Sequence, residues 1–375
     1  MAFAGRDLES NKEVAQSSLA RPEIHSFAWK NVSIPKNKGT DDYKVLAENS
    51  GIVKAGELVA IVGPSGSGKS SLLKALSWRP VAMKCEAEAD FFINGVSADS
   101  RYIRQLSGYL DQDDALVGSL TVRETLDFSA RLSLPKDIDT KQREERVQAL
   151  LEHLGLKDQS ESFIGTPIRR GISGGQKRRV SLAASIITER NIYFLDEPTS
   201  GLDSAAALDV MKYLKKLAHV RKLLVIAAIH QPSKAIVDHI DKFMLLSKGL
   251  TVCWGPYEDI QEYFRIGAGS TPRAIRSGTP TWAQQPLPQR AGANQSNTSV
   301  EDVMEYINTD FCPDPTKTNA RMETLRKTWH VSDMRTYLLT EIEQTTTALT
   351  VKRTLARSDV VSATFPTVLG ALAYR

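Results

Sequence analysis

The stretch Leu58-Val-Ala-Ile-Val62-Gly63-Pro-Ser-Gly-Ser-Gly68-Lys69-Ser70 decides the fold of this chain. Its uninterrupted apolar run predicts a buried strand, and the residues from Lys69 onward have the pattern of a helix. Between them, the spacing G-x-x-x-x-G-K-[ST] is that of a phosphate-binding loop. A Gly- and Ser-rich turn before a helix is the alternative interpretation. The strand, the Lys-Ser pair and the helix together favour the phosphate loop.

This loop supplies the first group of candidate ligands. Its glycines let backbone N–H groups converge on phosphate, and the helix N-terminus adds a favourable dipole. Lys69 would neutralise the β- and γ-phosphates of a nucleotide, and Ser70 would offer its hydroxyl to Mg²⁺. The predicted nucleotide-binding residues here are Gly63, Pro64, Ser65, Gly66, Ser67, Gly68, Lys69, Ser70 and Ser71.

Two further apolar runs predict buried strands, Ile192-Tyr-Phe-Leu195 and Leu223-Leu-Val-Ile-Ala-Ala-Ile229. Apolar strands that alternate with helical stretches imply an α/β fold, with a mostly parallel sheet covered on both faces. Asp196 and Glu197 follow the first of these strands. Asp196 is placed to hold Mg²⁺ through its hydration shell, and Glu197 to polarise an attacking water as general base. An ordinary acidic strand end is the alternative.

Composition excludes several classes of protein. The 375 residues carry a net charge of +4, which is weak evidence for nucleic acid or an anionic membrane surface as a partner. Three widely separated cysteines argue against a disulfide framework or a zinc site. The first residues lack the apolar stretch of a signal peptide. No run reaches the ~20 apolar residues of a membrane-spanning helix, so we expect none in this chain.

The run Ile172-Ser173-Gly174-Gly175-Gln176 resembles the signature sequence of ABC ATPases, with Ile172 in the position of the usual leucine. As a small-residue helix start, it could bind phosphate through its backbone N–H groups and Ser173. The resemblance implies that it reaches across a dimer interface to the γ-phosphate held by a partner's phosphate loop.

Other matches to this family imply further roles. Gln112 resembles the loop glutamine that senses Mg²⁺ and links the two lobes, and Asp203 resembles the loop that crosses to the partner. His230, at the end of the third apolar strand, resembles the switch histidine that contacts the γ-phosphate. Tyr43 lies roughly where the family places an adenine-stacking aromatic, and Phe27 and Trp29 compete for that role.

The amino-acid sequence from Ser26 to Phe264 resembles the G (White/pigment) subfamily of ABC proteins, for example in Gly118-Ser-Leu-Thr-Val-Arg-Glu-Thr-Leu. In that subfamily the nucleotide domain precedes a six-helix membrane domain, and two such halves export lipids, sterols, pigments or drugs. This chain ends before any such domain, so a membrane-spanning partner would lie in a missing C-terminal part or in a separate chain. The basic trio Lys177-Arg-Arg179 is interpreted as a solvated helix face rather than a nucleic-acid patch.

The predicted organisation has four parts. Residues 1–24 form a polar tail, and residues 25–265 form the nucleotide-binding domain, a RecA-like core with an N-terminal antiparallel β subdomain and a helical subdomain inserted at about 113–188. Residues 266–298 form a Pro-, Gly- and Gln-rich linker. Residues 299–375 form a helical tail that leads toward the membrane domain.

We therefore expect an ATPase that dimerises around two Mg-ATP molecules at the cytoplasmic face of a membrane and drives export of a lipophilic substrate. A soluble ABC ATPase acting on ribosomes or nucleic acid is one alternative. It is disfavoured by the single phosphate loop and by the absence of sustained heptads between Lys69 and Ser173. A regulatory domain that no longer hydrolyses ATP is a second alternative, although every expected catalytic position holds a competent residue.

Overall fold

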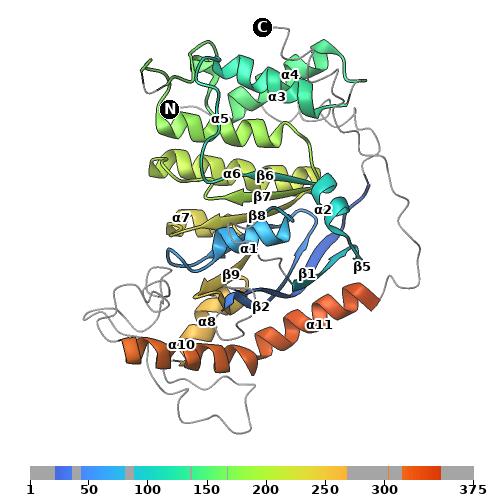
Figure 1. The fold of residues 1–375 in the computed structure, drawn as a ribbon, viewed down its shortest axis with the longest axis vertical. Coiled ribbons are helices and arrows are strands. Elements are labelled where there is room, and N and C mark those ends of the chain that lie inside the picture. Colours follow the sequence, from blue (N-terminus) through green and yellow to red (C-terminus); the bar gives the residue numbers. More distant parts are fainter. Residues whose placement is uncertain are drawn as a thin grey trace, which may run out of the picture.

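The computed structural model describes residues 22–35, 44–80, 88–135, 137–166, 168–267, 303 and 315–347. One mixed sheet runs through the middle of the molecule, with α3 and α4 at one end and α10 and α11 at the other (Figure 1). The strands are β1 (Ser26–Pro35), β2 (Lys44–Lys54), β3 (Leu58–Val62), β4 (Glu88–Ile93), β5 (Val96–Ser97), β6 (Ser107–Leu110), β7 (Ile192–Asp196), β8 (Leu224–Ile229), β9 (Lys242–Ser247) and β10 (Leu250–Gly255). The helices are α1 (Lys69–Leu76), α2 (Ser100–Leu106), α3 (Val122–Ser133), α4 (Thr140–His153), the short 3₁₀ turn η1 (Lys157–Gln159), α5 (Gly174–Ile186), α6 (Ser204–Arg221), α7 (Lys234–Val237), α8 (Tyr257–Gly267), α10 (Pro315–His330) and α11 (Asp333–Thr347).

The sheet has a parallel part and an antiparallel part, in the order β5-β4-β1-β2-β10-β9-β3-β8-β7-β6. β3 pairs in parallel with β8 and β9, and β7 pairs in parallel with β6 and β8. β1 pairs antiparallel with β2 and β4, and β4 pairs antiparallel with β5. This arrangement confirms the predicted fold class, a mostly parallel core with antiparallel N-terminal strands.

The three strands predicted from apolar runs lie side by side at the centre of the parallel part. Every residue of β3, β7 and β8 is buried. A parallel strand is covered on both faces, so it shows a continuous apolar run instead of alternation. Burial of each Val, Leu or Ile side chain stabilises the fold by about 1.5–3 kcal/mol, which makes these strands the core on which the loops stand.

The helices α3, α4 and α5 form a lobe at one end of the molecule, within the stretch predicted as a helical insertion (Figure 1). α3 begins at a capping box, in which the Thr121 hydroxyl accepts from the Glu124 N–H and the Glu124 carboxylate accepts from the Thr121 N–H. α4 buries Val147, Leu150 and Leu151, which share one helical face.

The C-terminal helices α10 and α11 pack back onto the sheet against β2 and β10. Their buried side chains, among those that the structure describes, include Leu325, Trp329, Leu338 and Ile342. Glu341 adds ion pairs across this contact, 2.6 Å from Lys54 and 3.7 Å from Lys242. Residues 1–21 of the predicted N-terminal tail and nearly all of the predicted linker lie outside the described residues, and the domain boundaries stay predictions.

Glu189 joins the helical lobe to the core. Its carboxylate lies 2.9 Å from Arg146 on α4 and 3.2 Å from Arg221 at the end of α6. Its side chain is only 15% exposed, so water screens these charges weakly. One carboxylate thus holds two guanidinium groups from different parts of the chain.

We predict that Glu189→Gln lowers the free energy of unfolding by about 1–2 kcal/mol, because two half-buried cations lose their shared counter-charge. Urea denaturation monitored by circular dichroism measures the change. The matched control is Glu161→Gln, whose carboxylate pairs with Arg123 at 75% exposure and should shift stability by less than about 0.5 kcal/mol. Equal losses in the two variants would contradict the role given to Glu189.

Candidate active site

The phosphate loop leaves the carboxyl end of β3 and folds tightly against β9. A Cβ atom at Gly63 would lie 2.1 Å from the Leu246 carbonyl oxygen, so only glycine fits there. Gly68 has φ of +101° and caps the N-terminus of α1, a conformation that other residues rarely adopt. The loop therefore has the backbone shape that its sequence predicted, and it opens a helix as a phosphate site requires.

Two side chains inside the loop carry the groups that suit a phosphate. Lys69 is 6% exposed, and its Nζ donates to the carbonyl oxygens of Gly63 at 2.8 Å and Pro64 at 2.9 Å. The Ser67 hydroxyl is buried and has no hydrogen-bond partner among the described residues. A buried ammonium and a buried hydroxyl without a partner, beside a glycine cradle, fit an anionic ligand.

Ser70 and Asp196 meet beside this loop. The Ser70 Oγ donates to Asp196 Oδ1 at 2.9 Å. Asp196 is 1% exposed, and burial together with the neighbouring Glu197 charge raises its pKa, against the hydrogen bond from Ser70. No group of three or more His, Cys, Asp or Glu that could hold a metal occurs in the described part of the chain. One hydroxyl and one carboxylate nevertheless fit Mg²⁺, which typically takes one or two protein oxygens together with water and substrate phosphates.

Glu197 and His230 stand at the same edge of the sheet. Glu197 adopts φ of +51°, and its N–H donates to the Ala228 carbonyl oxygen of β8 at 3.0 Å. A left-handed conformation at a non-glycine residue costs on the order of 1 kcal/mol or more, and such strain concentrates at functional sites. His230 directly follows β8 and is half-buried. The structure therefore gathers Lys69, Asp196, Glu197 and His230 at the carboxyl ends of neighbouring parallel strands.

The predicted signature lies at the start of α5 and not in the loops that follow β3, β7 and β8. Ser173 caps the helix in a capping box with Gln176, and both Ser173 and Gly174 are exposed. Gly175 lies against Gly201 and Leu202, in the loop before α6 that Asp203 caps. The signature and the Asp203 loop thus adjoin each other and face outward.

The remaining predicted residues divide into two groups. Gln112 is exposed, in the loop after β6. Tyr43 lies outside the described residues. Its competitors Phe27 and Trp29 are both 0% exposed in the core, which leaves neither able to stack on an adenine.

The interpretation of Lys177-Arg-Arg179 as a solvated face is wrong for Arg178. Arg178 is 3% exposed, while Lys177 and Arg179 are half-buried. The signal that could have revealed this is periodicity, because Arg178 shares a buried helical face with Leu182 and Ile186.

Sequence reasoning also gave no role to Tyr109, whose half-buried ring lies 4.7 Å from the Arg79 guanidinium. Burial and the nearby Asp196 charge raise the pKa of Tyr109.

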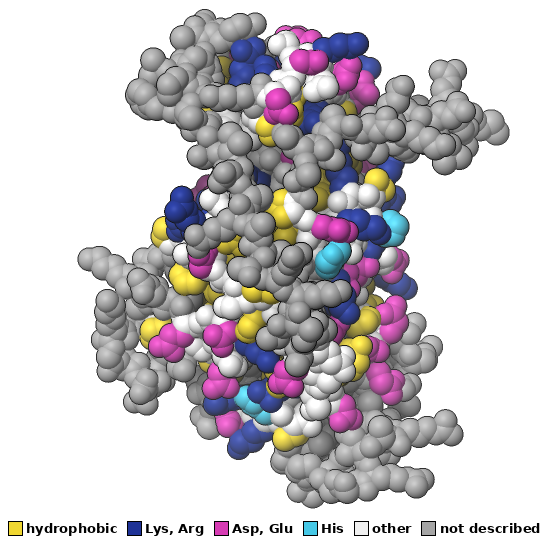
Figure 2. Space-filling view, turned by 90° about the vertical axis from the view of Figure 1, so that its right-hand side faces the viewer, with side chains coloured by type: hydrophobic (Ala, Val, Ile, Leu, Met, Phe, Trp, Pro, Cys, Tyr) yellow, Lys and Arg dark blue, Asp and Glu magenta, His cyan; other side chains and the backbone are white. Residues whose placement is uncertain are grey.

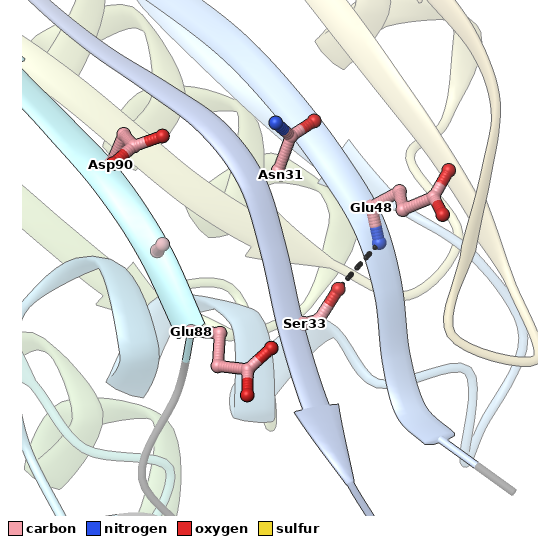
Figure 3. Close-up of a pocket in the computed structure, with 6 residues that line it drawn as sticks. Asn31, Ser33, Glu48, Glu88 and Asp90 are labelled. Carbon is pink, nitrogen blue, oxygen red and sulfur yellow. Dashed lines mark hydrogen bonds between the residues drawn. The ribbon is translucent and has the colours of Figure 1, made fainter. Parts of the chain in front are cut away.

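An open cavity of about 490 Å³ lies elsewhere, over the antiparallel strands β1, β2 and β4 (Figure 3). Its lining residues are Asn31, Ser33, Glu48, Glu88, Ala89 and Asp90, which include none of the predicted site residues. Three carboxylates repel a phosphate, so this cavity does not suit a nucleotide.

Comparison with known proteins identifies the family of this domain. A family model described as ABC transporter matches residues 46–200, which contain the phosphate loop, the signature and the Asp196-Glu197 pair. The chain contains a domain that matches the ABC transporter family. It is 41% identical over 252 residues to the rat "Broad substrate specificity ATP-binding cassette transporter ABCG2", covering 66% of this chain and 38% of that protein.

Other relatives of this ABC domain belong to the same G family. The chain is 41% identical over 264 residues to ABC transporter G family member 22 of Dictyostelium discoideum, covering 68% of this chain and 42% of the relative. It is 44% identical over 222 residues to G family member 20 of Arabidopsis thaliana, covering 59% of this chain and 30% of the relative. The chain thus spans well under half the length of these relatives.

A solved structure supports the fold of the ABC domain. The chain is similar to cbiO1 from Clostridium perfringens, part of the ABC transporter complex cbiONQ, with a TM-score of 0.51 and 21% identity. The likeness covers 64% of this chain and 91% of cbiO1. Among the residues that the model describes, no helix combines the length and apolar character needed to cross a bilayer.

We predict that Asp196→Asn stabilises the nucleotide-free ABC domain at neutral pH. Because the folded-state pKa of Asp196 is raised, ionisation of this carboxyl costs stability as the pH rises through that pKa. Below the unfolded pKa of about 3.9 the cost disappears, so the advantage of the variant should fade as the pH falls toward 4. Urea denaturation of both proteins in EDTA, from pH 5 to pH 8, measures the difference. An advantage that grows toward acid pH would refute the prediction.

Proposed function

We propose that this ABC domain hydrolyses ATP as the motor of a G-type transporter and drives export of a lipophilic substrate across a membrane. The observation that carries this proposal is the placement of Lys69, Ser70, Asp196 and Glu197 at one edge of the sheet, in a domain similar to those of G-family members. The membrane-spanning part would belong to a longer form of this chain or to a separate chain, so the ABC domain would work at the cytoplasmic face of the membrane.

Each residue of the site has a role suited to its surroundings. Lys69 places its ammonium beside the phosphate loop, where it can leave its carbonyl partners to neutralise the β- and γ-phosphates of ATP. Ser70, Asp196 and Gln112 would hold Mg²⁺, which when bound neutralises charge that develops on the phosphates. Glu197 would take the proton of the attacking water, and His230 would contact the γ-phosphate.

Two copies of the ABC domain are needed in this proposal. The exposed start of α5 offers backbone N–H groups and the Ser173 hydroxyl to a ligand outside its own chain. The signature of one copy would close on ATP held in the phosphate loop of the other, and Asp203 would lie at the same interface. The second copy can be identical or a different G-type domain.

The alternative is a soluble ABC ATPase that acts on ribosomes or nucleic acid. Such a protein needs a surface dominated by positive charge. Figure 2 instead shows Lys and Arg interspersed with Asp and Glu over the face in view. The similarity to G-family transporters also favours the transport role. Salt-dependent binding of RNA or DNA would favour the alternative.

We predict that Lys69→Ala lowers ATP turnover by about 10²–10³-fold, because it removes the cation that offsets charge on the phosphates. Phosphate release measured with saturating Mg-ATP tests this. Lys216→Ala, on the exposed face of α6, is the matched control and should keep wild-type turnover. Unchanged turnover in Lys69→Ala would exclude this loop as the catalytic site.

We also predict that Glu197→Gln binds ATP with wild-type affinity but hydrolyses it at least about 100-fold more slowly, because the amide cannot accept a proton from water. The trapped nucleotide should hold two copies together. Light scattering should then show an increase in mass on addition of Mg-ATP that reverses in EDTA. A mass that does not respond to Mg-ATP would contradict the two-copy arrangement.

A further inference from the structure

Arg178 joins three separate segments of the chain. Its Nη1 donates to the carbonyl oxygens of Asp111 at 2.7 Å and Gln112 at 3.2 Å, both in the loop after β6. Its Nε donates to the Glu197 carbonyl oxygen at 3.1 Å, and its Nη2 donates to that of Asp196. A single side chain on α5 therefore binds the main chain at Gln112, at the proposed Mg²⁺ ligand Asp196 and at the proposed general base Glu197.

The charge of Arg178 is balanced inside the protein. Its guanidinium lies 2.8 Å from the Asp114 carboxylate, which is 22% exposed. A buried cation without such a partner is strongly unfavourable, but the ion pair and four carbonyl acceptors give each of its three nitrogens at least one acceptor. Arginine suits this position because its planar, forked donors reach acceptors on several sides at once, which the single ammonium of lysine cannot do.

We propose that Arg178 is a positioning residue that fixes the Gln112 loop against the carboxyl end of β7. This inference rests on the proposed ATPase function and assigns a role to a residue outside its catalytic set. All of its recorded bonds go to main-chain carbonyls and to Asp114, so Arg178 acts through other residues rather than on ATP. Its bonds set the distance between the Gln112 and Asp196 side chains, and a shared Mg²⁺ requires that distance to be held closely.

Loss of Arg178 should weaken metal binding without weakening nucleotide binding. Among the described residues, Arg178 bonds only Asp111, Gln112, Asp114, Asp196 and Glu197, none of them in the phosphate loop, so its loss should leave metal-free ATP binding intact. Its loss should instead loosen the pair of side chains that meet at the metal. We expect Arg178→Gln to bind a fluorescent ATP analogue in EDTA within about twofold of wild type, while Mn²⁺ affinity falls at least about fivefold.

The experiment measures Mn²⁺ binding by electron paramagnetic resonance with a non-hydrolysable ATP analogue, together with turnover at varied Mg²⁺. Turnover of Arg178→Gln should fall about tenfold or more and recover partly at high Mg²⁺. In a Gln112→Ala background the same substitution should change Mn²⁺ affinity by less than about twofold, because Arg178 acts through that loop. Arg123→Gln, in an exposed ion pair on α3, is the matched control and should behave as wild type.

Several outcomes would overturn the proposal. One is that Arg178→Gln binds Mn²⁺ as tightly as wild type. Another is that Arg178→Gln loses affinity for metal-free nucleotide as much as it loses affinity for Mn²⁺. The third is that Arg178→Gln lowers Mn²⁺ affinity as much in the Gln112→Ala background as it does alone. If Arg178→Gln does not fold, Arg178→Lys replaces it, because lysine keeps the charge but makes fewer hydrogen bonds. Arg178→Lys must then show a smaller loss of Mn²⁺ affinity than the roughly fivefold loss expected for Arg178→Gln. Mn²⁺ binding is read without hydrolysis, so an inactive wild type would refute the proposed function while still testing the role of Arg178.

Discussion

Parallel hydrogen bonding joins β3 to β8 and β8 to β7, and the positions of the phosphate loop, Asp196, Glu197 and His230 depend on it. The register pairs Val62 with Ile229 and Asp196 with Ala228. Since parallel strands point the same way, the phosphate loop, the acidic pair and the histidine all emerge at one edge. The apolar side chains of these strands supply the stability, and the loops at their ends can then hold polar and strained conformations.

Several features of that edge oppose stability. Asp196 is a buried carboxyl with a raised pKa, Glu197 has a left-handed backbone, and the Ser67 hydroxyl lacks a partner among the described residues. The buried carboxyl of Asp196 and the Ser67 hydroxyl would be relieved by a metal or a ligand that supplies the missing charge or hydrogen bond. An active site that is complete only with its substrate has this character, because groups poised for a ligand are unsatisfied without it.

The C-terminal helices α10 and α11 add to the structure outside the part that matches the ABC transporter family. α10 and α11 cover β2 and β10 and are fastened by Glu341 to Lys54 and Lys242. β2 also carries Leu46, whose side chain lies against Gly68 of the phosphate loop. The helices therefore rest on the strands that support the nucleotide site. A tail expected only to lead away toward a membrane domain is, over residues 315–347, part of the packed structure.

The sequence by itself determined the parallel core, the phosphate loop and the acidic pair. Continuous apolar runs specify strands buried on both faces, and Gly63 and Gly68 meet requirements that no other residue satisfies. Only the tertiary structure revealed Arg178 and the Arg146-Glu189-Arg221 ion pairs, and only it placed the helical tail. The physical reason is that a charged residue is expected from sequence to be exposed to solvent. Its burial depends on hydrogen-bond acceptors and counter-charges that folding brings from distant segments of the chain. Local patterns encode strands and loops, but the partners of a buried charge exist only once the chain has folded.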